Sequence, residues 1–164
     1  MQEFASITDN LERVTDKLKV PPHSIDAEQA VLGGIMLDNN AWDLVADLVS
    51  EQDFYRQDHR LIFRALSQLS EGSHPLDVVT LSEWLENNNK LTNPGGMHYL
   101  GMLAKNTPSA ANIKAYAGIV RERSVLRQLA GVGTTICNNA FNTEGRNSVE
   151  LLDHAEQAVF KIAE

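Results

Sequence analysis

Apolar residues recur along most of the chain at the three- and four-residue spacing of amphipathic helices. Ala27, Val31 and Ile35, with Leu32 and Met36 beside them, give one helical segment its buried face, because residues four apart lie on one side of a helix. Strict alternation of apolar and polar residues, which marks a half-buried strand, is weak throughout. The pattern therefore predicts an all-α protein.

Caps and breakers divide the region up to residue 108 into five predicted helices. The first follows Ser24, the second carries Trp42, the third runs from about Asp58 to Glu71, and the fourth carries Trp84. The fifth carries Tyr99. Serine, asparagine and aspartate favour helix starts, while glycine and proline favour helix ends. The residues that mark these helix ends are Ser24, residues 38–40, Gly72, Asp77, residues 87–89 and the turn at 94–96.

Beyond residue 108, the sequence predicts a long helix over about 110–140 with two apolar stripes, roughly 100° apart by helical geometry. A loop at 142–147 and a last helix complete a predicted antiparallel hairpin. One stripe, with two residues of the last helix, is expected to form the hairpin core: Ile119, Leu126, Ala130, Cys137, Leu152 and Val159. The second stripe then needs another partner, either the head of the same chain or a second chain. We expect the chain–chain interface at Val125, Leu129, Val132 and Ile136.

The predicted organisation is a compact five-helix head followed by this hairpin. Residues 20–108 form the head, and residues 109–164 form the hairpin, used for association between chains. Residues 1–19 precede Pro21 and Pro22, which stop any helix, and are polar apart from a few apolar positions. They are expected to be a flexible tail, either a frayed helix or disordered. The segment has no clean apolar stripe beyond Ile7, Leu11, Val14 and Leu18.

The charge balance argues against a free-standing binder of duplex DNA. The chain has 22 Asp and Glu against 14 Lys and Arg, a net charge of −8, whereas such binders usually present a basic surface. The stretch from 105 to 127 is locally basic. Its alternatives are a solvated helix face and a nucleic-acid-binding module, in which weak contact with single-stranded DNA would fall to Arg121, Arg123 and Arg127.

No pattern of catalytic or ligand-binding residues emerges. The sequence lacks the glycine-rich phosphate loop with its lysine. Gly131 and Gly133 begin like a dinucleotide fingerprint, but Ile136 occupies the third glycine position. No two of the five histidines are spaced four apart, and Cys137 is the only cysteine. We therefore expect no catalytic, nucleotide or metal site and no cofactor in this chain. One cysteine and no long apolar run fit a cytoplasmic protein without a membrane span.

Four blocks of sequence, in order, carry a resemblance to a known family. They are residues 20–39 (VPPHSIDAEQAVLGGIMLDN), residues 53–63 with Asp53-Phe-Tyr55, His59 and Ile62-Phe63, residues 75–81 (PLDVVTL), and residues 106–123 with NTPSAAN, Tyr116-Ala and IVRER. With them the chain resembles the N-terminal domain of bacterial replicative DNA helicases of the DnaB family. The first 19 residues are outside the resemblance.

The resemblance implies a role in assembly rather than catalysis. In that family the N-terminal domains form a collar on a hexameric ring, pairing through the hairpin into a trimer of dimers. The collar docks primase and, in some bacteria, a helicase loader. ATP-driven unwinding of duplex DNA belongs to a RecA-like motor, so ATP and Mg²⁺ are expected there and not in this chain. Tyr99 is a candidate for partner docking, with a place in the core as the alternative reading.

Overall fold

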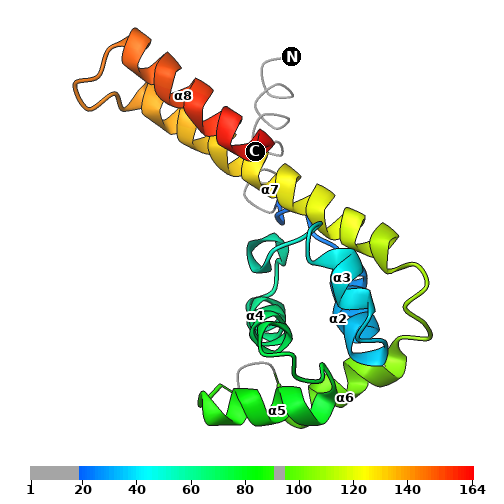
Figure 1. Ribbon diagram of the computed structural model, residues 1–164. Helices are drawn as coiled ribbons and strands as arrows, with labels where there is room; N and C mark the ends of the chain where they lie inside the picture. Colours follow the sequence, from blue (N-terminus) through cyan, green and yellow to red (C-terminus); the bar gives the residue numbers. More distant parts are fainter. Residues whose placement is uncertain (1–18, 91–94) are drawn as a thin grey trace, which may run out of the picture.

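The computed structural model describes residues 19–90 and 95–164, and every regular element in those residues is a helix (Figure 1). The predicted all-α fold is confirmed. The tail expected for residues 1–19 lies outside the described residues except for Lys19. The elements are α2 (Ile25–Leu37), α3 (Ala41–Val45), a 3-10 helix η1 (Glu51–Asp53), α4 (Gln57–Glu71), α5 (Val78–Asn87), α6 (Gly96–Asn106), α7 (Ile113–Phe141) and α8 (Ser148–Ala163).

Side-chain caps open several helices where the sequence predicts them. Ser24 Oγ accepts a hydrogen bond from the Ala27 amide at 3.3 Å, and Asp77 Oδ1 accepts one from the Thr80 amide at 2.8 Å. Asn147 and Glu150 form a reciprocal capping box at the start of α8. Each cap satisfies amide groups that have no partner within the helix, which explains why these boundaries can be read from the sequence.

The core of the head surrounds α2. Val31, Leu32 and Ile35 have no exposed surface, and α2 packs against α6, α7 and α4. At Gly33 the approach is so close that an added Cβ would lie 2.0 Å from Thr107 Oγ1 and 2.4 Å from the Leu103 carbonyl oxygen. The other fully buried large apolar residues are Phe54, Ile62, Leu66, Leu81, Leu85, Leu100 and Ile113.

The long helix α7 belongs to two parts of the molecule. Its first part packs on the head through the buried Ile113, Ala117 and Val120, whereas α8 runs back along its far part (Figure 1). The predicted boundary at residue 108 is therefore misplaced, because the first turns of α7 complete the head core. The hairpin projects from the head, and Ile162 is the only residue of α8 that is buried.

Candidate interaction surfaces

A buried carboxylate joins the head to the long helix. Asp53 is 3% exposed. Its Oδ1 accepts hydrogen bonds from Arg121 Nη1 at 2.9 Å and Ser124 Oγ at 2.7 Å, and its Oδ2 accepts one from the Ser50 amide at 2.8 Å. Because both oxygens are engaged, α7 is held at a fixed position on the head.

Arg127 makes a second connection at the same joint. Its Nη1 donates to the Pro22 carbonyl at 2.8 Å and its Nη2 to the Asp53 carbonyl at 2.5 Å. The guanidinium also lies over the ring of Tyr55, 5.6 Å from the ring centre, and Tyr55 stacks on His23. Removal from water lowers the pKa of Arg127, although such a group stays protonated at any physiological pH.

These contacts bear on the predicted nucleic-acid surface. Of the three arginines, Arg121 and Arg127 direct their guanidinium groups into the joint within the same chain. Arg123 is half-buried and has no hydrogen bond or ion pair in the part of the chain that the structure describes. Contact with single-stranded DNA stays a prediction, and two of the three residues proposed for it are already engaged elsewhere.

The predicted hairpin core is wrong for the single chain. Its six residues are all exposed; Leu152, at 69%, is exposed the most, and Cys137 lies on the surface rather than in a core. The two helices instead meet through residues on another side of each helix. Those that line the space between them include Val132, Ile136, Leu151, Ala155, Ala158 and Ile162.

The stripe predicted as the chain–chain interface is divided by this arrangement. Val132 is half-buried and Ile136 is 38% exposed, and both line the seam with α8. Val125 is half-buried near the joint, and Leu129 is 45% exposed. The head therefore does not cover Leu129, which rules out the alternative in which the whole stripe is buried within one chain.

What remains on the surface of the hairpin is unusually apolar. Large side chains that are expected inside a protein are at least a third exposed along both helices, although a soluble monomer rarely exposes apolar residues so close together. Sequence analysis missed Phe141, Val149 and Phe160, because single exposed apolar residues carry no signal of their own. The exposed set is Ile119, Leu126, Leu129, Ile136, Phe141, Val149, Leu152, Val159 and Phe160.

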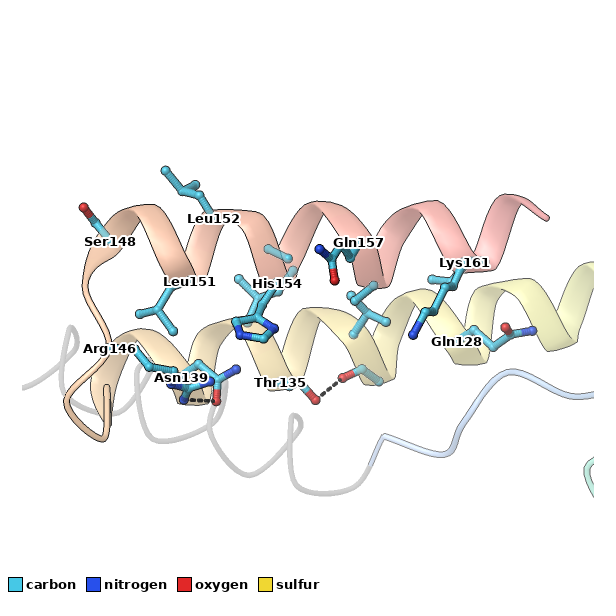
Figure 2. A pocket seen from close by; sticks show the side chains of 16 residues that line it. Gln128, Thr135, Asn139, Arg146, Ser148, Leu151, Leu152, His154, Gln157 and Lys161 are labelled. Atoms are coloured by element: carbon cyan, nitrogen blue, oxygen red, sulfur yellow. Dashed lines mark hydrogen bonds between the residues drawn. The ribbon is translucent and has the colours of Figure 1, made fainter.

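A groove follows the seam between α7 and α8 (Figure 2). In this view His154 and Lys161 lie across the space between the helices, and Leu152 points away from α7. Arg146 lies at the loop end, where its Nη2 donates to Asn139 Oδ1 at 3.3 Å. The floor is apolar and the rim is polar, so the groove can accept an amphipathic segment.

Tyr99 belongs to a buried polar network in the head. Its hydroxyl lies 2.6 Å from His59 Nε2, and His59 Nδ1 lies 2.8 Å from Glu28 Oε1. Glu28 Oε2 also accepts from the Tyr55 amide at 2.8 Å. Glu28 and His59 are 1% and 0% exposed. A neutral His59 that carries its proton on Nδ1 satisfies both neighbours.

These contacts favour the interpretation of Tyr99 as part of the head core over its interpretation as a partner-docking residue. The residue is half-buried, Arg56 lies over its ring, and burial is the largest cause that raises its pKa. Sequence analysis missed Glu28 and His59 as a pair. The available signal was a carboxylate and an imidazole on otherwise apolar helix faces, where an unpaired polar group would be costly.

Neither a metal site nor a membrane span is found among the residues that the structure describes. No group of three His, Cys, Asp or Glu side chains there is arranged to hold a metal ion. None of the described helices combines the length and apolar character needed to cross a bilayer.

Known proteins resemble this chain in sequence. Residues 20–122 match the family described as the DnaB-like helicase N-terminal domain. The replicative DNA helicase DnaB of Haemophilus influenzae is 46% identical over 153 residues, which cover 93% of this chain and 33% of that protein. The chain thus spans about a third of the length of the curated relatives it matches.

Solved structures show the same fold. The crystal structure of the N-terminal domain of DnaB helicase from Mycobacterium tuberculosis matches with a TM-score of 0.84 and 34% identity, covering 87% of this chain and 99% of that one. A structure described as a DnaB-like replicative helicase and its interactions with primase matches with a TM-score of 0.68 at 23% identity, covering 83% of this chain and 31% of that one. The second likeness concerns the fold alone.

Proposed function

Because this chain belongs to the family of DnaB-like helicase N-terminal domains, we propose that it is the collar domain of a hexameric replicative helicase. In this proposal it assembles chains through its hairpin and docks primase. The parent protein unwinds duplex DNA with ATP, and the ATP and Mg²⁺ chemistry belongs to the remainder of that protein. The setting is the cytoplasm. Contacts with a helicase loader, and weak contact with single-stranded DNA, are finer expectations of the same proposal.

The observation that carries the proposal is the exposed apolar surface of the hairpin. Leu126 and Leu129 on α7, with Leu152 and Val159 on α8, are between 37% and 69% exposed. Burying one such side chain contributes roughly 1.5–3 kcal/mol. Several from each of two chains offset the cost of association. These residues do not pack between α7 and α8. A partner chain that covers them best explains why so many apolar side chains are exposed together.

A single charge on that surface tests the assembly role. Leu129→Asp leaves the head intact because Leu129 lies outside its core, and it weakens self-association because an unpaired charge resists burial. We expect the dissociation constant from sedimentation equilibrium to rise at least about tenfold, which corresponds to about 1.4 kcal/mol. Val79→Asp is the matched control, since Val79 is 66% exposed on the head.

The outcomes separate assembly from other roles. Unchanged association of folded Leu129→Asp protein, or an equal loss in Val79→Asp, contradicts assembly through the hairpin. Primase docking is measured by calorimetry with a primase fragment. We expect binding to the unmodified protein and weaker binding to Leu129→Asp, because the proposal has primase bridge two paired hairpins.

A further inference from the structure

The head carries a groove between α3 and the second half of α4. Helix α3 packs on α2 and α7, whereas α4 packs on η1, α5 and α2, and a space of about 710 Å³ remains between α3 and α4. Its lining follows α4 from Phe63 to Glu71, which corresponds to about 12 Å of helix. This length suits a short segment of chain. The lining residues come from neither α7 nor α8, so the groove is separate from the hairpin surface.

The floor of the groove is aromatic. Trp42 is half-buried, and the centre of its ring lies 5.2 Å from that of Phe63. Phe63 and Val49 are each 5% exposed, so the open part of the Trp42 ring is the main apolar contact that the groove offers. Within the part of the chain that the structure describes, its indole N–H donates no hydrogen bond. Tryptophan is enriched among the residues that dominate binding, because it combines a large apolar ring with a donor.

The rim of the groove is acidic. Glu71 is the last residue of α4, while Asp43 lies on α3 and Asp47 in the turn that follows α3. All three side chains are exposed, and none makes an ion pair or a hydrogen bond with the residues that the structure describes. Arg64 is the only cation among the described lining residues, and its Nε already donates to Glu51 Oε2 at 2.8 Å. The rim therefore offers negative charge without a partner.

Electrostatics within the chain do not explain these carboxylates. Glu71 occupies the C-terminal end of α4, where the helix dipole is negative and favours a cation. Residues 19–90 have 12 Asp and Glu against 5 Lys and Arg, a side-chain net charge of −7, so the rest of the head adds to the repulsion. A cation supplied by a partner would relieve it.

We propose that the α3–α4 groove docks a short basic segment of a second protein. An apolar side chain of that segment packs on Trp42, and its cations lie beside the rim carboxylates, since complementary charge selects a partner and speeds its encounter. The same carboxylates repel nucleic acid and anionic lipid. A second copy of the head does not suit the groove either, because it would bring another net charge of −7 to the rim.

A titration of the isotope-labelled full chain, followed by nuclear magnetic resonance, tests the docking. The probe is a peptide of leucine, lysine and arginine with about ten residues, or about 15 Å when helical. We expect the indole N–H resonance of Trp42 to shift saturably. The indole of Trp84, which lies on α5, is the internal reference and should not shift.

Matched charge reversals locate the binding site. Asp47→Lys with Glu71→Lys should weaken binding at least about tenfold, because it reverses two charges at the rim. Glu83→Lys with Glu86→Lys is the control. It changes the net charge equally but on exposed positions of α5, so the peptide should bind this variant as it binds the unmodified protein. Circular dichroism should show that both variants stay helical.

Four results overturn the proposal. The first is a Trp42 resonance that stays unchanged up to about 1 mM peptide, and the second is binding that survives the rim reversal. The third is an equal loss in both double variants, which would mean attraction to the acidic head in general. The fourth is equal binding of a matched peptide with glutamate at every cation. Leu129→Asp should leave the titration unchanged, so this proposal and assembly through the hairpin fail independently.

Discussion

In the head, Ile62, Leu66 and Leu81 have no exposed surface, whereas in the hairpin Leu129 and Leu152 are 45% and 69% exposed. Both regions consist of amphipathic helices of similar apolar content. The apolar faces of the head helices are buried because several helices pack around α2. Two helices share only one seam, so a hairpin with wider apolar faces must leave part of them open. The apolar faces of the head are therefore buried within one chain, whereas the hairpin leaves part of its apolar surface exposed.

Matched leucine truncations should give the largest difference between the two regions. Leu66→Ala opens a cavity in the head and should lower the free energy of unfolding by about 2–5 kcal/mol. Leu152→Ala removes a surface side chain and should change it by less than about 0.5 kcal/mol in dilute protein. Urea denaturation measures both. A loss of more than about 2 kcal/mol of stability from Leu152→Ala, at a concentration where the protein is monomeric, would contradict the exposed placement of Leu152.

Matched carboxylate substitutions should show the same difference between head and hairpin for polar groups. Glu28 is buried against His59 and the Tyr55 amide, so Glu28→Gln should destabilise the protein by about 1–3 kcal/mol. Glu150 caps α8 on the surface, and Glu150→Gln should have an effect below about 0.5 kcal/mol, because glutamine also serves in a capping box. Equal effects in urea denaturation would mean that the head network contributes no more than an exposed cap.

A smaller effect is expected at the joint between the regions. Ser124 is 2% exposed and donates to Asp53 Oδ1, so Ser124→Ala should destabilise by about 0.5–1.5 kcal/mol. Thr134→Ala, on the exposed part of α7, removes only a hydroxyl that donates to the Ala130 carbonyl of its own helix. Thermal unfolding should therefore show a lower Tm for Ser124→Ala and almost none of that change for Thr134→Ala. A Tm for Ser124→Ala equal to that of the unmodified protein would contradict the assigned role of the joint.

The smallest expected effect is a pH dependence confined to the head. Burial, the largest cause, raises the pKa of Tyr99 above its usual 10.0, while a hydrogen bond from Gln29 opposes the shift. The folded protein therefore holds this proton more tightly than the unfolded chain. The resulting stability is fully present below about pH 10 and is lost as pH rises through the folded pKa.

Tyr99→Phe should reduce the fall in Tm between about pH 9 and pH 11, with Tyr116→Phe on α7 as the control. The comparison concerns the slope with pH, since Tyr99→Phe also removes the hydroxyl next to His59. An unchanged slope in Tyr99→Phe would show that other groups cause the alkaline loss of stability.

The sequence alone determined the helices and their boundaries. Ser24 and Asp77 cap the helices for which they were predicted, because a cap acts on amides two or three residues away and needs no distant partner. The inward face of α2 also followed from periodicity. The family resemblance, which depends on local motifs, was confirmed for the same reason.

Only the tertiary structure decided which apolar stripe of α7 meets α8. The two stripes are about equally apolar, so periodicity gave their separation but not their partners. The return path of α8 then set Val132 and Ile136 at the seam and left Leu126 exposed. Arg121 and Arg127 likewise contact Asp53, although they lie 68 and 74 positions away from it in the sequence. Local spacing cannot show such contacts, because they form only when the whole head has folded around α7.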